Sequence, residues 1–444
     1  MKLNFELNKK QDGLIVTGGE DIANELTIPS AQEFKGVMYP VIAIGDEAFA
    51  RQTQLRQVCI PESVMKIGKM AFAFCELNHI TIPESVLEIG DGAFYACDSM
   101  ESLHIPKSVT KIGYNVFSSE KGLFISVAED NNVYDSRENC NAIIETATST
   151  LIQGCSSTII PSTITQIGYQ AFCCCTNLEE IIIPNSVTKI GKMAFHACPD
   201  LCNLVIPDSV TEIGDDAFGG CFSLKSIFIP KSVTKIGDGA FTGTNNLSSI
   251  IVSEDNPIYD SREDCNALIE TATNTLLWGC NNTIIPNTVT RIRAMAFYEC
   301  TGLTSIEIPN SVETIEENTF YMCEKLQHVI ISDSVETIEE DAFYGCSSLT
   351  EIVIPESVKK IGFGAFMACR NLKEIFINDA SLLNGIGLRS DIKITNKKES
   401  IFNLTQAIQQ HKEHETEHFV ANGNKERAFL RIVKRLVRII FREN

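Results

Sequence analysis

Cysteine is the residue type of this chain with the most varied chemistry, because a thiolate can bind metals, form disulfides or act as a nucleophile. The 444 residues contain 17 cysteines. Nine occupy the same position of a repeated phrase: Cys75, Cys97, Cys175, Cys198, Cys221, Cys300, Cys323, Cys346 and Cys369. No Cys-x-x-Cys pair is matched by a second one, and the run Cys173-Cys174-Cys175 indicates no particular chemistry. We therefore interpret the nine as small core residues, with metal binding as the alternative.

Four further cysteines flank two predicted hairpins. Cys140 and Cys155 are 15 residues apart, and so are Cys265 and Cys280. One interpretation is a disulfide at the base of each hairpin, which would imply an oxidising compartment. The alternative is that each pair consists of two small residues packed under the hairpin.

Histidine gives little support for catalysis or metal binding. His411, His414 and His418 share one face of a predicted helix, but a metal site there would need a further ligand from elsewhere in the chain. A solvated helix face is the interpretation that we favour. The other histidines occupy unrelated positions of the repeat: His79, His104, His196 and His328. The glycines belong to a repeated Ile-Gly corner rather than to a phosphate loop. The sequence therefore predicts a protein that is not an enzyme, with no cofactor and no metal.

A repeat positions these residues. The phrase Ile-Pro-x-Ser-Val-x-x-Ile-Gly-x-x-Ala-Phe-x-x-Cys recurs mostly every 22 or 23 residues, with clean copies at 183–198 and 206–221. Such a period is typical of a solenoid, in which each unit buries its apolar face against its neighbours. Fifteen coils are marked by the residue that ends each Ile-x-Ile strand: Ile28, Ile60, Ile82, Ile105, Val127, Ile160, Ile183, Ile206, Ile229, Val252, Ile285, Ile308, Ile331, Ile354 and Ile377.

The residues of one unit explain why it coils. Ile181 and Ile183 alternate with Ile182 as the inward-facing residues of a strand should, and Pro184 lacks the N–H that would continue the pairing. Gly191 permits the next corner. Stacked coils place equal residues above one another, so the phenylalanines form a core column: Phe49, Phe72, Phe94, Phe117, Phe172, Phe195, Phe218, Phe241, Phe297, Phe320, Phe343 and Phe366. The predicted fold class is a β-rich repeat solenoid of about 15 coils.

The central residue of each Ile-x-Ile strand points away from the core. It is mostly polar in the first five coils and mostly apolar from Ile159 onward. If the face is open, this is an apolar stripe larger than a soluble monomer usually exposes, which predicts a surface for a protein or glycoprotein. The stripe residues selected are Ile182, Val205, Phe228, Ile251, Ile330, Val353 and Phe376. The alternatives are that β-branched residues favour strands, or that a partner protomer or the C-terminal segment covers the stripe.

Two long coils, 128–160 and 253–285, are near copies of each other. Each contains an Asp-Ser-Arg turn and two apolar strands, which predicts an inserted β-hairpin. Loops that interrupt a regular scaffold often carry recognition, so Tyr134, Tyr259 and Trp278 form a second candidate surface. A repeated structural corner is the alternative.

The repeated phrase resembles the BspA-like leucine-rich repeats of bacterial and some protist surface proteins, over about residues 26–378. The resemblance implies a curved, right-handed solenoid in a cell-surface or secreted protein that binds host proteins or matrix glycoproteins, as an adhesin does. Members commonly carry a secretion signal, whereas the segment 1–7 alternates like a strand and lacks the apolar run of such a signal. Localisation therefore stays open between the cell surface and the cytoplasm.

The predicted organisation is an N-terminal β cap (1–27), the solenoid (28–378), a linker (379–399) and a helical segment (400–444). The net charge of −20 argues against nonspecific nucleic-acid binding. Residues 425–442 are predicted to form a basic amphipathic helix that could fold back on the solenoid, contact an anionic membrane or bind a partner. The alternative is that this segment is loosely ordered. The predicted function is an adhesin-type binding protein; the alternative is an intracellular scaffold tethered through this helix, and a self-associating rod is a third hypothesis.

Overall fold

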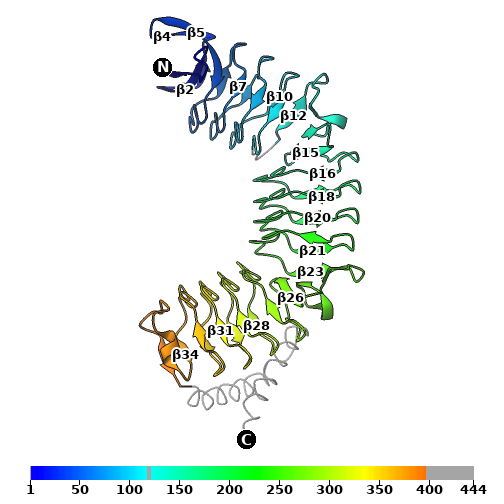
Figure 1. Cartoon of the computed structure of the whole chain (residues 1–444), viewed down its shortest axis with the longest axis vertical. Coiled ribbons are helices and arrows are strands. Elements are labelled where there is room, and N and C mark those ends of the chain that lie inside the picture. Colours follow the sequence, from blue (N-terminus) through cyan, green and yellow to red (C-terminus); the bar gives the residue numbers. More distant parts are fainter. Residues whose placement is uncertain (1, 118–121, 397–444) are drawn as a thin grey trace, which may run out of the picture. The chain divides into compact units, whose positions relative to one another are not determined.

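The computed structural model describes residues 2–117 and 122–396 as stacked β-coils (Figure 1). The chain divides into two compact units. Unit 1 comprises Met1–Pro286 and Ala296–Leu303, and unit 2 comprises Asn287–Met295 and Thr304–Asn444. Helical turns in the described ranges are the short 3-10 segments η1 (Arg137–Asn139), η2 (Arg262–Asp264) and η3 (Ala380–Leu383). The predicted β-rich repeat solenoid is confirmed.

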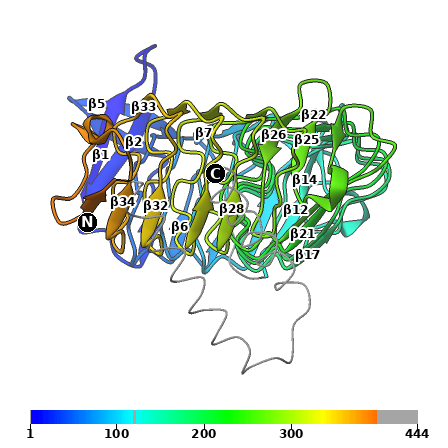
Figure 2. The ribbon, with the colours of Figure 1, turned by 90° about the horizontal axis from the view of Figure 1, so that it is seen from below.

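Each regular coil contributes one strand to a parallel ladder that we call the face strands. In unit 1 these are β3 (Glu25–Thr27), β6 (Gln57–Cys59), β8 (His79–Ile80), β10 (Ser102–Ile105), β12 (Phe124–Val127), β17 (Glu180–Ile182), β19 (Asn203–Val205), β21 (Ser226–Ile229) and β23 (Ser249–Val252). In unit 2 they are β28 (Ser305–Glu307), β30 (His328–Ile330), β32 (Glu351–Val353), β34 (Glu374–Phe376) and β35 (Lys393–Thr395). Within unit 2, β28, β30, β32 and β34 are neighbours in this order, and Figure 2 shows β28, β32 and β34 on the same side of the stack.

A second parallel ladder forms where Pro184 and its equivalents have ended the face strand and the chain has turned. Its two-residue strands are β7 (Lys66–Ile67), β9 (Glu88–Ile89), β11 (Lys111–Ile112), β16 (Gln166–Ile167), β18 (Lys189–Ile190), β20 (Glu212–Ile213) and β22 (Lys235–Ile236) in unit 1. Those of unit 2 are β27 (Arg291–Ile292), β29 (Thr314–Ile315), β31 (Thr337–Ile338) and β33 (Lys360–Ile361). Equivalent residues pair in register, as Ile190 does with Ile213. In-register pairing is what places equal residues in columns.

The phenylalanine column is buried, and its rings stack from coil to coil. The ring centroids of Phe195 and Phe218 are 5.4 Å apart with 5° between the planes. Stacked aromatic rings bury a large apolar area, at about 1.5–3 kcal/mol for each fully buried side chain. The column is interrupted at a hairpin coil, where Phe241 meets Trp278 edge to face at 6.0 Å.

Two side-chain hydrogen bonds explain the cysteine and serine of the repeated phrase. The Cys198 thiol donates to the Phe172 carbonyl of the preceding coil at 3.0 Å, and Cys221 does the same to Phe195 at 3.2 Å. Ser209 Oγ donates to the Val187 carbonyl, also one coil earlier, at 2.7 Å. A buried carbonyl without a partner is costly, so both columns join neighbouring coils. The cysteine column is thus a set of small buried residues, as the sequence predicted, with an added donor role that the pattern did not reveal.

The two hairpin coils have the same local topology. In the first, β13 (Tyr134–Asp135), β14 (Ile143–Glu145) and β15 (Thr150–Gln153) pair antiparallel in sequence order. In the second, β24 (Tyr259–Asp260), β25 (Leu268–Glu270) and β26 (Thr275–Trp278) do so with the same register. Each hairpin coil ends in Gly-Cys, and the glycine is required because a phenylalanine ring packs directly against its backbone. A Cβ on Gly154 would lie 2.3 Å from Cε1 of Phe172, and one on Gly279 would lie 2.0 Å from Cε1 of Phe297.

The N-terminal boundary differs from the prediction. The hairpin of β1 (Lys2–Leu7) and β2 (Leu14–Glu20) precedes the stack, but Glu25–Thr27 already pairs with β6 as a face strand. The unusually long first coil contains a further antiparallel hairpin, β4 (Ala31–Phe34) with β5 (Val37–Ile44), which the sequence did not reveal. Apolar and polar residues alternate only weakly in the segments of β4 and β5, because few side chains of this hairpin are buried.

The predicted linker at 379–399 is wrong over its described part, because the parallel ladder continues. β35 pairs with β34, with Ile394 opposite Ile375. Buried Ile386 and Ile392 supply the apolar contacts without the repeated phrase. The guanidinium of Arg389 donates to the carbonyls of Cys369, Arg370 and Leu372, which caps the last regular coil. The predicted helical segment 400–444, with its basic helix at 425–442, lies outside the described residues.

Candidate protein-binding face

The face strands of unit 1 expose a column of apolar side chains. Ile182 is 84% exposed although its strand neighbours Ile181 and Ile183 are buried, because alternate strand residues point to opposite faces. Ile182 pairs with Val205, and Phe228 pairs with Ile251, so the exposed side chains are adjacent on neighbouring strands. We call this column the apolar ridge; its members, between 49% and 84% exposed, are Ile182, Val205, Phe228 and Ile251 on face strands, and Ile159 and Ile284 at the same position of the two hairpin coils, outside any strand.

The same column is mostly polar in the coils that precede the first hairpin coil, although it also includes the exposed Cys59. Thr27, Thr81 and His104 are exposed there, and the imidazole Nδ1 of His104 lies 2.9 Å from the hydroxyl of Ser126. Backbone pairing is the same, since β10 pairs in parallel with β12 through all four residues. The ridge therefore begins at a defined place, at the first hairpin coil.

In unit 2 the column is less exposed, and one predicted member must be corrected. Ile330 and Val353 are half-buried, and the residue before them in the column is Glu307. Phe376 is only 4% exposed, so its assignment to an exposed stripe is wrong. It lies opposite buried Thr395 of β35, in the additional coil that the sequence did not reveal.

The predicted hairpin contacts are also corrected, because Tyr134, Tyr259 and Trp278 are each 6% exposed. The Tyr134 hydroxyl accepts the backbone N–H of Ile112 at 3.0 Å, and Tyr259 accepts that of Ile236 at 3.2 Å. These side chains hold the hairpin coil to the preceding coil and are not available to a ligand. Near-identical sequences here reflect a repeated structural corner.

The Asp-Ser-Arg turns belong to the same corner. Arg137 donates from Nε to Asp135 Oδ1 at 2.8 Å and from Nη2 to Oδ2 at 2.5 Å, and Arg262 holds Asp260 in the same way. Burial alone would raise the pKa of Asp135, but hydrogen bonds from Arg137 and Thr146 outweigh it and lower that pKa. Both charges are satisfied within the turn, so the turns offer no free ion to a partner.

The two hairpin disulfides are not formed. Cys140, Cys155, Cys265 and Cys280 are buried free thiols. Cys140 and Cys155 pack into different hydrophobic clusters, and the Cys155 sulfur accepts the side-chain amide of Asn141. Burial raises the pKa of Cys140 and raises that of Cys265 to about 11. A protonated buried thiol behaves as a small apolar residue, which was the alternative interpretation.

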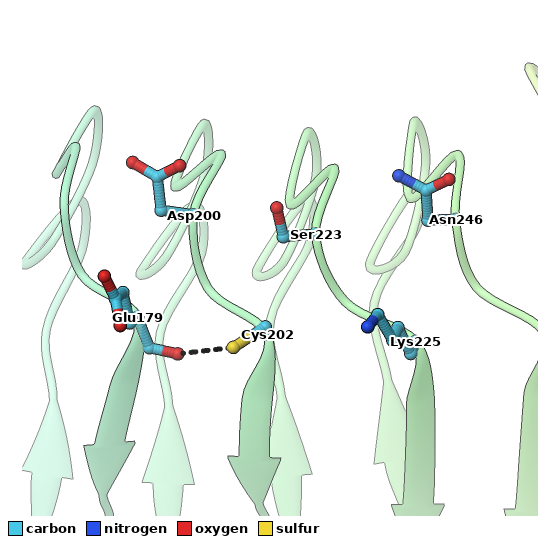
Figure 3. A pocket seen from close by; sticks show the side chains of 6 residues that line it. All are labelled: Glu179, Asp200, Cys202, Ser223, Lys225 and Asn246. Atoms are coloured by element: carbon cyan, nitrogen blue, oxygen red, sulfur yellow. Dashed lines mark hydrogen bonds between the residues drawn. The ribbon is translucent and has the colours of Figure 1, made fainter.

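An open depression of about 310 Å³ lies where three strands of the ridge begin (Figure 3). It is lined by Glu179, Asp200, Cys202, Ser223, Lys225 and Asn246. Glu179, Cys202 and Lys225 directly precede β17, β19 and the start of β21, three residues before the ridge positions. The Cys202 thiol donates to the Glu179 carbonyl at 3.4 Å. Acidic, basic and amide groups therefore border the ridge, although the sequence reading had not selected them.

Neither a cluster of metal-ligating side chains nor a membrane-spanning helix is found within residues 2–117 and 122–396. That part of the chain holds no group of three or more His, Cys, Asp or Glu arranged to bind a metal ion. It also contains no helix of the length and hydropathy needed to cross a bilayer. His411, His414 and His418 lie outside the described residues.

Stacked parallel coils with phenylalanine, cysteine and serine columns define a leucine-rich-repeat solenoid. The family described as "BspA type Leucine rich repeat region" matches residues 34–142, 150–262 and 277–387, so the chain belongs to the BspA-type leucine-rich-repeat family. This confirms the family resemblance of the repeated phrase. No curated protein matches the chain.

The solved structures that this chain is similar to include three bacterial proteins. A leucine rich cell surface protein of Faecalibacterium prausnitzii is 25% identical, with 89% of this chain and 93% of that chain covered and a TM-score of 0.44. A leucine-rich repeat protein of Bacteroides ovatus is 24% identical, covering 89% and 98%, with a TM-score of 0.39. The pneumococcal vaccine antigen PcpA is 19% identical, covering 89% and 84%, with a TM-score of 0.36.

Proposed function

We propose that this chain is a non-catalytic, adhesin-type protein that binds a protein or glycoprotein through the apolar ridge of unit 1. The observation that carries the proposal is the exposure of six apolar side chains at one position of successive coils. Soluble proteins rarely leave a contiguous apolar area of this kind uncovered unless it serves as an interaction surface. Membership of the BspA-type family supports the same class of function.

Strand formation alone does not explain the ridge. β-Branched residues favour strands, but threonine is also β-branched, and Thr27 and Thr81 occupy the same position in the earlier coils. A polar residue therefore suffices for the strand. The aliphatic side chains of Ile182 and Val205 add exposed apolar area that the fold does not require.

The border of the ridge has the composition of an interface rim. Interfaces combine a buried apolar centre with a polar edge that supplies hydrogen bonds. Glu179, Lys225 and Asn246 provide an acceptor, a cationic donor and an amide next to the strands of the ridge. Aromatic side chains often anchor such interfaces, and Phe228 lies between Val205 and Ile251. We place the centre of the binding surface at Phe228.

The test uses the full chain and a panel of purified matrix glycoproteins: fibronectin, fibrinogen, laminin and collagen. Affinity is measured by biolayer interferometry for the unchanged chain, for Val205→Asp and for the matched control Thr81→Asp, which also changes an outward face-strand residue. We expect at least one glycoprotein to bind, with affinity reduced tenfold or more by Val205→Asp and within twofold for Thr81→Asp. Equal effects of the two changes, or no binding to any of the four, would contradict the proposal.

A further inference from the structure

Cys173 and Cys174 form a pair of adjacent thiols that the scaffold does not require. Their sulfurs lie 3.7 Å apart; Cys173 is buried and Cys174 is half-buried. Cys174 has a φ of +58°, as do its equivalents in other coils, among them Ala197 at +55° and Gly220 at +71°. Alanine and glycine therefore adopt this turn conformation equally well, so the turn does not require the thiol of Cys174. The structural cysteine of the coil is Cys175, the next residue.

Two other coils contribute polar groups to this pair. The Tyr95 hydroxyl donates to Cys174 Sγ at 3.5 Å from a turn that lies 79 residues earlier. The backbone N–H of Cys174 donates to the His196 carbonyl at 2.8 Å. The His196 imidazole has a buried Nδ1 without a hydrogen-bond partner. The sulfur of Cys174 thus lies near the thiol of Cys173, the phenol of Tyr95 and the imidazole of His196.

These neighbours stabilise a thiolate on one sulfur. The hydrogen bond from Cys173 is the main cause that lowers the pKa of Cys174, to about 6; burial opposes it, and Tyr95 and His196 add to the lowering. The same contacts raise the pKa values of Cys173 and Tyr95, so both stay protonated as donors. Other titratable groups nearby include Asp98, whose charge acts on Tyr95, and Cys175 and Cys198, whose pKa values are raised chiefly by burial.

The second hairpin coil provides an internal comparison. The phenylalanines that precede these turns correspond as Phe94 to Phe218 and as Phe172 to Phe297. At the second junction the positions of Tyr95, Cys173 and Cys174 are therefore held by glycine, tyrosine and glutamate: Gly219, Tyr298 and Glu299. The scaffold is duplicated, whereas the thiol cluster is not.

We propose that Cys174 is a site of S-thiolation by low-molecular-weight disulfides, with Cys173 and Tyr95 as the donors that position and activate its sulfur. In the step, Cys174 Sγ attacks one sulfur of R–S–S–R. A Cys174–S–S–R bond forms as the R–S–S–R bond breaks, and the leaving RS⁻ takes a proton from water. The cysteine is oxidised and one RS unit is reduced to the thiol.

The pH dependence of the reaction is distinctive. A thiolate of low pKa is abundant at pH 6 but intrinsically less nucleophilic, whereas an ordinary thiol of pKa about 8.5 is mostly protonated at that pH. The reaction rate of Cys174, relative to that of a cysteine-containing reference peptide, should be highest at pH 6. This advantage in rate should be lost by pH 8.5. The ratio of the two rates should fall on the order of 80-fold from pH 6 to pH 8.5, because the thiolate fraction of the reference peptide rises far more than that of Cys174. The Brønsted slope of about 0.4–0.5 lowers the ratio by the same factor at both pH values.

The experiment treats the native full chain with glutathione disulfide or iodoacetamide and reads the modified sites by peptide mass spectrometry. We expect Cys174 to be the most rapidly modified cysteine at pH 6, ahead of the exposed Cys59 and the half-buried Cys202. Cys173→Ala should move the pH midpoint of Cys174 alkylation upward from about 6. Tyr95→Phe should move it in the same direction by less.

Cys174→Ala is the folding control, because alanine occupies the equivalent turn at Ala197. It should keep the circular dichroism spectrum and abolish the fast modification. The proposal is overturned if Cys59 or Cys202 reacts faster at pH 6, if Cys174 reacts only after unfolding in urea, or if Cys173→Ala leaves the pH midpoint unchanged. A role limited to packing would not shift that midpoint.

Discussion

The coils before the first hairpin coil and the coils between the two hairpin coils share one backbone and differ in one outward position. Thr27, Thr81 and His104 occupy it in the first group, and Ile182 and Val205 in the second. The inward residues are apolar and buried in both, since Leu103 and Ile181 both lie in the core. The fold therefore constrains the inward position and leaves the outward one free. We interpret the apolar choice between the hairpin coils as a functional one.

The comparison can first be tested on stability, where the effect is largest. Ile181→Thr places a hydroxyl in the core and should destabilise the protein by about 2–4 kcal/mol. The reason is that less apolar area is buried and that the buried hydroxyl lacks a hydrogen-bond partner. Ile182→Thr, one residue away on the exposed side, should change stability by less than about 0.5 kcal/mol. Urea unfolding followed by circular dichroism measures both. Equal losses would show that Ile182 is a structural residue after all.

The hairpin coils that delimit the ridge should respond alike. Asn131 donates to the carbonyls of Pro106 and Val109 and accepts from the N–H groups of Val133 and Tyr134; Asn256 makes the matching set. Asn131→Ala and Asn256→Ala should each cost about 2–3 kcal/mol, because buried backbone groups lose their partners. Exposed Asn132→Ala serves as the control.

Thermal unfolding of these three variants checks the expectation. Asn131→Ala and Asn256→Ala should lower the melting temperature by similar amounts, and Asn132→Ala should lower it little. A loss in only one of the two copies would mean that the hairpin coils are not equivalent corners, and the second copy would then need its own functional explanation.

The ridge itself should show a smaller effect, confined to binding. Val205→Thr restores the residue type of the earlier coils and should weaken binding of the glycoprotein partner about three- to tenfold, or about 1 kcal/mol, by removing apolar contact area. Stability in urea should stay within about 0.5 kcal/mol. Unchanged affinity together with unchanged stability would place the partner elsewhere on the chain.

The smallest effect is expected from pH. The pKa values of Asp135 and Asp260 are lowered in the folded state, so their stabilisation is present above the unfolded carboxyl pKa of about 3.9 and is lost as pH falls through the lower folded values. The unchanged chain should therefore lose more stability between pH 5 and pH 3 than Asp135→Asn/Asp260→Asn. The difference should be about 1 kcal/mol or less, and urea midpoints at the two pH values measure it.

Most of the fold could be predicted from the sequence because the repeat dictates it. In-register stacking follows from the period, and the buried position of Phe195 follows from its place in the phrase. The last coil could not be predicted, since Ile386 and Ile392 pack without the repeated phrase and Arg389 caps carbonyls from a segment with no periodicity. The sequence period predicts the contacts that recur in every coil, but it does not predict contacts that occur at only one place in the chain.

The candidate site was less predictable for a related reason. Alternation identified the outward position of Ile182, but it could not show that Phe376 is covered by an additional strand. Aromatic residues in an insertion suggested recognition at Tyr134, whereas its hydroxyl accepts a backbone N–H from the preceding coil. Contacts between coils decide whether such a side chain is buried, and a single sequence does not contain them. The same limit hid the contact between Tyr95 and Cys174.

The central claim is that the partner lies on the ridge between the hairpin coils. The most direct measurement is photo-crosslinking of the full chain to the proposed glycoprotein partner, with p-benzoylphenylalanine placed in turn at position 205, at position 81 and at the exposed hairpin position 139. We predict a strong crosslink from position 205 and background from the other two. A crosslink from position 139 or 81 that exceeds the one from position 205 would contradict the account.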